Sequence, residues 1–405
     1  MTSPGVPCPA ELTIDREAAV QRLMRFLAVE GTTGNEAAIA AEVTTALIEA
    51  GIPRSAIRHD SANSRIVLPT QTGNLLVDLP GTRPGPRLLF MTHLDTVPLC
   101  AGAKPVRKLD RIVPESRTAL GGDNRTGVAA LVTLAATLVE RKLPHPPITL
   151  LFTVREESGL FGARHVDLAD LGGPVMGFNV DGRLAADITI GAVGAERWEV
   201  EISGKAAHAG VHPDKGISAT IVAAVALADV FRGGWFGKVV QGDRQGTSNV
   251  GSFGDAEGYC AGEATNVVTD FVRLTGESRS HDPETATLIT QAYRNAFAKA
   301  AAEVKDDLGQ TATVKFESRL DYYPFRIPED APVVSHAKRA IERLGWQPAT
   351  RIANGGLDAN WMVRHGIPTI TVGAGQNQIH TVEEWVDVEE FVRGCQAVLS
   401  LATVE

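Results

Sequence analysis

Histidine and acidic side chains recur directly after short apolar runs of this chain. His93 and Asp95 follow one such run, and the pair Glu156-Glu157 follows another at 148–154. His93 offers a neutral imidazole as a metal ligand, and Asp95 can accept the other ring N–H and fix the tautomer. Two adjacent carboxylates repel each other unless a cation or a proton intervenes. These residues therefore point to a metal site or to acid–base chemistry.

Three further polar groups occupy comparable positions. Asp123 follows two glycines directly before a helical stretch, Asp181 ends the apolar run 175–180, and His380 comes after the run 369–372. Each has a simpler explanation when taken alone. A histidine is often structural, an aspartate before a helix is often its N-cap, and acids at strand ends are often only solvated.

Together these residues favour a two-metal site. The carboxyl ends of strands in an open α/β sheet meet at one edge, so the two histidines and the acids are expected to converge there. Two imidazoles and three or four carboxylates suit two zinc ions with one shared carboxylate, and Co²⁺ or Mn²⁺ would be substitutes. Two metals can polarise a carbonyl and generate hydroxide near neutral pH. The Glu156-Glu157 pair can supply one ligand and one general base.

Composition and net charge exclude several classes of protein. The 405 residues suit two domains, and the 44% hydrophobic and 21% charged content is that of a folded protein. A net charge of −9 argues against nucleic acid or an anionic membrane as partner. No apolar run is long enough to span a membrane, and residues 1–11 lack the features of a signal peptide. The four cysteines are far apart in sequence and predict reduced thiols in a cytoplasmic protein: Cys8, Cys100, Cys260 and Cys395.

The elements that position the polar groups alternate between strands and helices. Asp15 and Asn35 are expected to cap two N-terminal helices, and a helix over 128–139 separates strands that read as buried on both faces. This order predicts an α/β domain with a mixed, largely parallel sheet and helices on both faces. From about residue 197 the order strand–helix–strand–strand–helix–strand predicts a separate α+β module with an antiparallel sheet. We therefore expect a catalytic domain of residues 1–196 and 320–405, interrupted by an inserted domain of residues 197–319.

Six motifs carry a family resemblance. They are HLDTVP, LGGDNRTG, VREESGLFGA, NVDG, GGLDAN and GAGQNQIHTVEEW. In this order they resemble the co-catalytic di-zinc metallopeptidases that include peptidase T, glutamate carboxypeptidase, succinyl-diaminopimelate desuccinylase and aminoacylase. They look most like the peptidase T (tripeptide aminopeptidase) branch, and the likeness runs from about residue 15 to 400.

The resemblance implies a role for each matching residue. His93 and Asp181 would hold one zinc, Glu157 and His380 the other, and Asp123 would bridge them. Asp95 would orient His93, and Glu156 would be the general base that activates the zinc-bridging water.

The resemblance also extends to the inserted domain, which would act as a lid and as a dimerisation domain. His208, in the segment GKAAHAG, would help stabilise the oxyanion, in cis or across a homodimer. Asn266, Arg279 and the loop residues Gly355 and Gly356 would contact the substrate.

Two departures from the family pattern bear on the substrate. Asn124-Arg125 stands where the family often has Asp-Lys, and Leu357 replaces the threonine of a GGTDG-type loop. Neither touches the ligand set, so short peptides or acylated amino acids remain the expected substrates.

An N-acyl amino acid deacylase or a carboxypeptidase on the same metals is the alternative enzyme. A catalytically silent zinc-binding scaffold is the alternative of another class, and the retained Glu156 argues against it. A nucleotide-binding protein is disfavoured, because no Walker-type or GxGxxG loop follows a strand.

Overall fold

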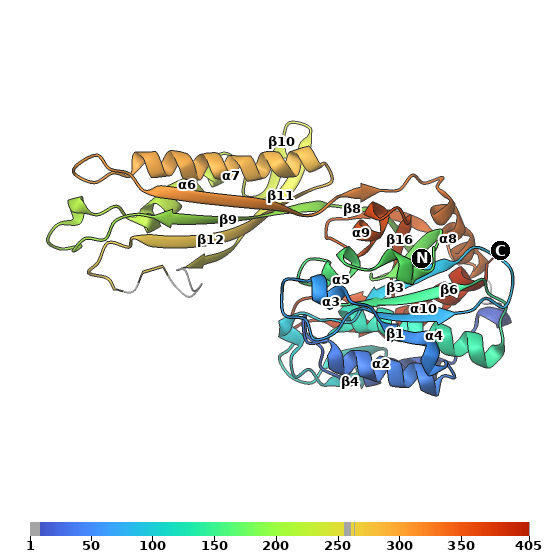
Figure 1. Ribbon diagram of the computed structural model, residues 1–405. Coiled ribbons are helices and arrows are strands. Elements are labelled where there is room, and N and C mark those ends of the chain that lie inside the picture. The colour runs from blue at the N-terminus through green and yellow to red at the C-terminus, as the bar shows by residue number, and fades with distance from the viewer. Residues whose placement is uncertain (1–8, 255–260, 263, 405) are drawn as a thin grey trace. The chain divides into compact units, whose positions relative to one another are not determined.

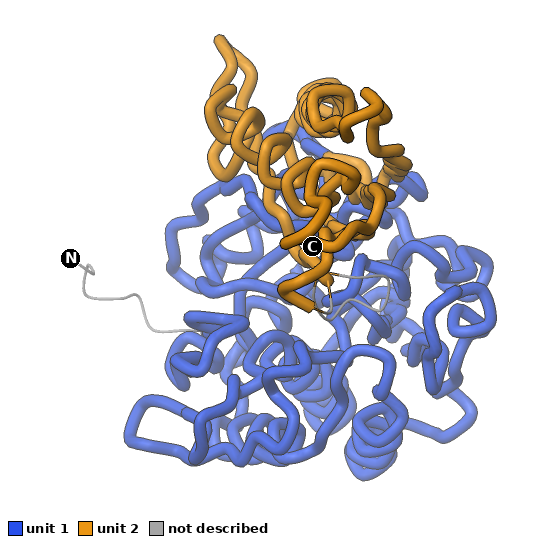
Figure 2. Tube along the Cα trace, turned by 90° about the vertical axis from the view of Figure 1, so that its left-hand side faces the viewer, with its two compact units in different colours: residues 1–192, 325–405 blue, residues 193–324 orange. Residues whose placement is uncertain are grey.

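A computed structural model describes residues 9–254, 261–262 and 264–404, which form two compact units (Figures 1 and 2). Unit 1 comprises Met1–Ala192 and Phe325–Glu405, and unit 2 is Val193–Pro324. The chain therefore leaves unit 1 once and returns to it once. The inserted domain predicted over residues 197–319 lies within unit 2.

The centre of unit 1 is a nine-stranded mixed sheet with the order β1-β2-β6-β3-β7-β16-β8-β14, and with β15 paired to β8. Strands β6, β3, β7 and β16 are parallel neighbours, whereas β1, β2 and β14 pair antiparallel. The strands are β1 (Ile57–His59), β2 (Leu75–Leu79), β3 (Leu88–His93), β6 (Ile148–Thr153), β7 (Met176–Val180), β8 (Asp187–Ala192), β14 (Phe325–Arg326), β15 (Ala349–Ala353) and β16 (Thr369–Val372). The predicted mixed, largely parallel sheet is confirmed.

Both faces of this sheet are covered by helices. In β2, Leu75 and Val77 join the core that includes α1, α2, α4 and α10, whereas Leu76 joins a second core with α5 and α9. Side chains alternate across a strand, so a run that is apolar at every position is buried on both sides. The helices are α1 (Arg16–Leu27), α2 (Ala37–Glu49), α3 (Ala62–Arg65), α4 (Gly122–Arg141), α5 (Phe161–Arg164), α8 (Pro332–Arg343), α9 (Ala359–Arg364) and α10 (Val388–Thr403).

The N-terminal helices begin differently from one another. The Asp15 carboxylate accepts a hydrogen bond from Ala18 N at 3.0 Å, as expected of an N-cap. Asn35 does not cap α2. Its side chain contacts Thr32 and Gln71 instead, and Glu36 occupies the N-cap position without a capping bond. The predicted Asn35 cap is therefore wrong.

A second, four-stranded sheet of unit 1 has the order β17-β18-β5-β4. Its strands are β4 (Pro105–Lys108), β5 (Arg111–Pro114), β17 (Gln376–Asn377) and β18 (Trp385–Asp387). It joins the segment before α4 to the segment after β16. This sheet was not predicted from the sequence, because strands of two to four residues carry too few positions to show a period.

Unit 2 is an antiparallel five-stranded sheet with the order β10-β11-β12-β9-β13, and α6 (Ala219–Arg232) and α7 (Pro283–Glu303) pack on one face. The strands are β9 (Gly194–Ser203), β10 (Gly237–Gln241), β11 (Arg244–Gly254), β12 (Phe271–Ser280) and β13 (Thr313–Tyr322). The antiparallel α+β module was predicted, but with four strands, because β10 was not recognised. The other face of the sheet, which we call the open face, carries the alternate side chains of the same strands.

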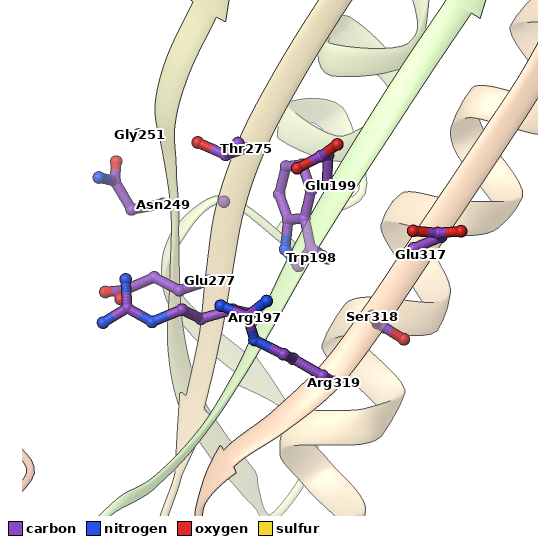
Figure 3. A pocket seen from close by; sticks show the side chains of 11 residues that line it. Arg197, Trp198, Glu199, Asn249, Gly251, Thr275, Glu277, Glu317, Ser318 and Arg319 are labelled. Carbon is purple, nitrogen blue, oxygen red and sulfur yellow. The ribbon is translucent and has the colours of Figure 1, made fainter. Parts of the chain in front are cut away.

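The core of unit 2 lies between its sheet and its helices. Trp198 of β9 is 2% exposed and its ring lies 4.6 Å, between centroids, from the ring of Tyr293 on α7. A Cβ at Gly276 of β12 would lie 2.1 Å from the Trp198 ring, so only glycine fits opposite the indole. Neighbouring residues Arg197 and Glu199 consequently point to the open face (Figure 3). Among the described residues, no helix is long and apolar enough to cross a membrane.

Candidate metal centre

The parallel strands of unit 1 bring the predicted ligands to one edge. His93 is the last residue of β3, Glu156 and Glu157 follow β6, and Asp181 follows β7. Because these strands are adjacent and parallel, their carboxyl ends lie side by side. His380 lies on the loop after β17. It contacts Glu157, which places it at the same edge of the sheet.

Asp123 lies between the two imidazoles. Its Oδ1 is 3.1 Å from His93 Nε2, and its Oδ2 is 3.2 Å from His380 Nε2. A further acid lies near the same nitrogen of each ring: Asp181 Oδ1 is 3.9 Å from His93 Nε2, and Glu157 Oε2 is 2.9 Å from His380 Nε2. One carboxylate thus faces two ligand pairs, which is the arrangement that a bridging ligand requires.

We call these groups the His–carboxylate cluster: His93, Asp123, Glu156, Glu157, Asp181 and His380. Two sets of three offer ligand atoms within 4.8 Å of one another. The first is His93, Glu156 and Asp181, and the second is His93, Asp123 and Glu157. Glu156 thus has a carboxylate oxygen within 4.8 Å of ligand atoms of His93 and Asp181. The structure brings all five proposed ligands and the proposed base together.

The electrostatics of the cluster call for added positive charge. Burial raises the pKa of Glu157 to about 7 and that of Asp181 to about 6, with repulsion from Asp123 adding to both. Hydrogen bonds that His380 donates to the Asp123 and Glu157 carboxylates raise its pKa to about 10. Burial alone would lower the pKa of His93, but Glu156 and Asp123 offset it and the pKa is raised well above its usual value.

This charge pattern tests whether metal ions fit the site. Four acids surround two imidazoles and raise the pKa of both, which favours a positive charge at this place. Divalent cations would replace the ring protons and would leave neutral imidazole and carboxylate donors, the ligand set of zinc and of Co²⁺ or Mn²⁺. The residues present therefore fit a pair of such ions.

Two buried carboxylates hold the turn that carries Glu156 and Glu157. The Asp95 carboxylate accepts hydrogen bonds from Glu156 N at 3.0 Å and Glu157 N at 3.1 Å. Glu36 Oε1 accepts from Arg155 N at 3.0 Å and from Gly34 N at 2.7 Å. Three consecutive amides are thus bound from outside the turn, which fixes the direction of both glutamate side chains.

Asp95 also contacts His93, although less directly than the sequence suggests. His93 Nδ1 lies 3.0 Å from the Asp95 backbone oxygen and 3.4 Å from its Oδ1. The shorter of these contacts fixes the ring through the main chain. The carboxylate makes its best hydrogen bonds to the amides of the glutamate turn, so Asp95 joins His93 to that turn.

Glu384 holds the turn that carries Asp123. Its carboxylate accepts hydrogen bonds from Leu120 N at 2.8 Å, Gly121 N at 2.9 Å and Asp123 N at 3.0 Å. Gly121 has φ of 82°, a left-handed conformation that favours glycine, and the Asp123–Asn124 peptide is cis. The left-handed conformation explains Gly121, and a Cβ at Gly122 would lie 2.7 Å from Val386 Cγ2 and 3.1 Å from Glu384 Oε1, so both positions of the LGGDN motif favour glycine.

Asn124 and Arg125 have structural roles. Asn124 Oδ1 accepts from Gly127 N at 3.0 Å, so Asn124 rather than Asp123 caps the continuous part of α4. Arg125 is buried and donates to the backbone oxygens of Leu94 and of Phe26, the latter at 3.2 Å. It ties the end of α1 to the residue between His93 and Asp95.

Several residues that hold the proposed ligands in place were not predicted from the sequence. Glu36, Glu384 and Gln376 were not singled out, although Gln376 Nε2 donates to Asp181 Oδ1 at 3.0 Å. Asp358 is buried against the Thr153 hydroxyl and its pKa is raised to about 7 by burial. Glu384 and Gln376 lie within the quoted motif around His380, which was the available signal. Glu36 gave none, because an acid at the start of a helix usually faces water.

The remaining predicted residues belong to other segments, namely the connection after β15 and unit 2. Gly355 and Gly356 form the turn between β15 and α9, and a Cβ at Gly355 would meet nothing within 4 Å. His208 and Asn266 belong to adjacent segments of unit 2, where Ala209 N donates to Asn266 O at 2.9 Å. Arg279 of β12 forms an ion pair with Glu277, with Nε 2.9 Å from Oε1.

Comparisons with known proteins cover nearly the whole chain. The model of Peptidase family M20/M25/M40 matches residues 89–403. An uncharacterized protein, YqjE of Bacillus subtilis, is 31% identical over 96% of this chain and 98% of its own length.

Solved structures agree in fold. Aminopeptidase PepT from Bacillus cereus has a TM-score of 0.78 and 32% identity over 96% of this chain and 98% of its own. A tripeptidase from Staphylococcus aureus has a TM-score of 0.84 and 28% identity, and the shares covered are 97% and 99%.

Proposed function

The chain belongs to Peptidase family M20/M25/M40, and on this premise we propose that it is a metal-dependent aminopeptidase of the peptidase T type acting on short peptides. The observation that carries the proposal is Asp123, whose two carboxylate oxygens each face one imidazole. Likeness to an aminopeptidase PepT and to a tripeptidase over nearly the full chain favours the peptide class.

Five side chains would hold two divalent ions, zinc being the first candidate. His93 and Asp181 would bind one ion, Glu157 and His380 the other, and Asp123 both. When bound, such ions polarise the scissile carbonyl and make water a better nucleophile. The Glu384, Asp95 and Gln376 contacts keep these ligands in place.

Glu156 would act as the general base. Burial raises its pKa well above the usual value, with nearby Asp181 and Glu157 adding to the shift. A carboxylate in such surroundings gains a proton readily, so Glu156 can take one from the attacking water and return it to the leaving amine. Its backbone is fixed through Asp95, which keeps the carboxylate directed at the ligands.

Residues of unit 2 would complete the site. His208 would donate to the oxyanion, and Asn266 and Arg279 would contact the substrate, with Gly355 and Gly356 lining the approach in unit 1. A homodimer through unit 2 stays a prediction. It is supported by exposed apolar side chains on α6, where Ile221 is 52% and Phe231 70% exposed. A cytoplasmic location and the lack of nucleic acid or membrane partners also stay predictions.

Activity and metal content test this proposal together. Purified protein should contain about two divalent ions per chain, lose activity with a chelator and regain it with Zn²⁺, Co²⁺ or Mn²⁺. It should cleave free tripeptides and fail on N-acetylated ones. Full activity without divalent ions would overturn the proposal.

The same panel separates the alternatives. Cleavage of N-acetylated peptides but not of C-terminally amidated ones would indicate a carboxypeptidase, and release of acetate from acetylated amino acids a deacylase. Bound metal without any turnover would indicate a silent scaffold.

A further inference from the structure

Asp358 is a buried acid of unit 1 that the proposed mechanism does not use. It belongs to the GGLDAN motif and directly precedes α9, yet its side chain makes no capping bond to that helix. Its exposed fraction is 1%. An aspartate before a helix usually accepts a hydrogen bond from the first turn, so the reason for an acid at this position lies elsewhere.

The side chain of Asp358 is bound to the sheet edge that carries the proposed metal ligands. Its Oδ2 forms a hydrogen bond with the hydroxyl group of Thr153, the last residue of β6. Thr153 is the direct partner of His93 on β3, so both side chains leave the sheet on the same face. Leu94 N also donates to Thr153 O at 2.7 Å. Asp358 thus contacts Thr153, and Thr153 holds the residues around His93.

The hydrogen atom of the Thr153 hydroxyl indicates the direction of these bonds. This hydroxyl has a single hydrogen but lies near two oxygens, Asp358 Oδ2 and the backbone oxygen of Thr92, the latter at 3.2 Å. The backbone oxygen can only accept. If Asp358 carries a proton, it donates to Thr153, and Thr153 donates to Thr92. If Asp358 is ionised, one of the two contacts has no hydrogen.

Burial makes a negative charge on Asp358 costly. Within the described part of the chain Asp358 forms no ion pair, and its Oδ1 has no hydrogen-bond partner. A buried carboxylate needs a cation or several donors, whereas a neutral acid tolerates one unpaired oxygen at lower cost. Burial, with repulsion from Asp95 and Asp181, raises the pKa of Asp358 to about 7, although Thr153 and His93 oppose the shift.

We infer that Asp358 is a positioning residue that works as a neutral carboxylic acid, donating a hydrogen bond to Thr153 and so holding the end of β6 beside His93. The inference rests on the proposed function, in which His93 is a metal ligand. Asp95 has the opposite role, because its two oxygens accept from the amides of Glu156 and Glu157. One of these acids is needed as a donor and the other as an acceptor.

Replacement by the matching amide distinguishes a donor from an acceptor. Asparagine has nearly the shape of aspartate and supplies an N–H₂ group. Asp358→Asn should therefore bind Zn²⁺ within about threefold of wild type in a titration against a competing chelator, whereas Asp358→Ala should bind it about tenfold more weakly. Asp95→Asn is the matched control. It turns an N–H₂ group toward a backbone N–H and should weaken Zn²⁺ binding by about 10–100-fold.

Thr153→Val removes the hydroxyl group and keeps the shape of the side chain. It should weaken Zn²⁺ binding as Asp358→Ala does. The double variant should be no weaker than either single one, because both changes break the same contact. Urea unfolding of the metal-free proteins verifies that each variant folds, and Thr153→Val takes the place of Asp358→Ala if the latter does not fold.

Equal Zn²⁺ affinities of Asp358→Asn and Asp358→Ala, whether both weakened or both as in wild type, would overturn the inference. Additive losses in the double variant would also overturn it. Failure of the wild type to bind Zn²⁺ would instead contradict the proposed function.

Discussion

The His–carboxylate cluster of unit 1 and the open face of unit 2 both gather charged side chains, but they hold them by different means. Around the cluster, buried carboxylates of Glu36, Asp95 and Glu384 accept hydrogen bonds from backbone amides of the turns that carry it. On the open face, partly exposed arginines and acids pair with one another directly, as Arg273 does with Glu199 of the neighbouring strand and Arg279 with Glu277 of its own strand.

The two regions should therefore respond differently to mutation. A carboxylate that binds several amides sets the path of the main chain, so its loss displaces other side chains. An exposed ion pair between two long side chains contributes little, because water and salt screen it. The cluster should therefore be sensitive to single changes, whereas the open face should lose little stability when one of its ion pairs is removed.

The largest effects are expected inside the cluster. Glu156→Ala removes the base and should lower kcat by about 10²–10⁴-fold while keeping the metal content of wild type. Asp123→Ala removes the ligand shared by both imidazoles and should lose metal as well as activity. Metal analysis beside steady-state kinetics distinguishes the two. Near wild-type turnover by Glu156→Ala would show that another group is the base.

A smaller loss is expected one contact away. Glu384→Ala leaves three amides of the Asp123 turn without their acceptor and should weaken metal affinity by about 10–100-fold. Metal titration in a competing chelator measures this. Glu383→Ala changes the exposed neighbour and is the control. Equal affinities in the two variants would mean that the turn keeps its shape without Glu384.

Glu36 predicts a pH effect on stability. Burial, with Asp95 nearby, raises its pKa from 4.5 to about 7, so between these values the folded state binds more protons than the unfolded state. The free energy of unfolding of the metal-free protein should therefore fall as pH rises through this window, by a few kcal/mol at most.

Glu36→Gln keeps an oxygen for the Arg155 and Gly34 amides and cannot ionise. It should flatten this part of the pH profile, as measured by urea unfolding at several pH values. A profile as steep as that of wild type would assign the pH dependence to other groups.

The smallest effect is expected on the open face. Arg273→Ala breaks the 2.6 Å pair with Glu199, in which both side chains are about a third exposed, and should cost at most ~1 kcal/mol of stability. Thermal unfolding at low and high salt measures it. A loss of several kcal/mol would remove the contrast between the two regions.

The residues of the cluster were easier to predict from the sequence than the residues that hold them in place. His93, Asp181 and the glutamate pair follow buried strands, and parallel strands end at a common edge whatever their exact order. Their convergence therefore needs only the strand periods. Glu36 lies more than a hundred residues from the Arg155 amide it binds. No local sequence pattern predicts such a long-range contact.

The open face shows a second limit. The adjacency of Arg197 and Arg319 depends on the register between β9 and β13, which includes a bulge near Leu320. A shift of one residue moves every side chain to the opposite face. The sequence indicated both strands but not their register, so it could not predict that these two arginines are neighbours.

The points where the chain leaves and re-enters unit 1 have a practical consequence. Ala192 and Phe325 are paired residues of β8 and β14, so the two ends that removal of residues 193–324 would leave are already neighbours. A two-residue Asn-Gly hairpin loop spans such a gap. Unit 2 can thus be deleted, or exchanged for the inserted domain of another member of the family. The junction would be designed as an ordinary β-hairpin.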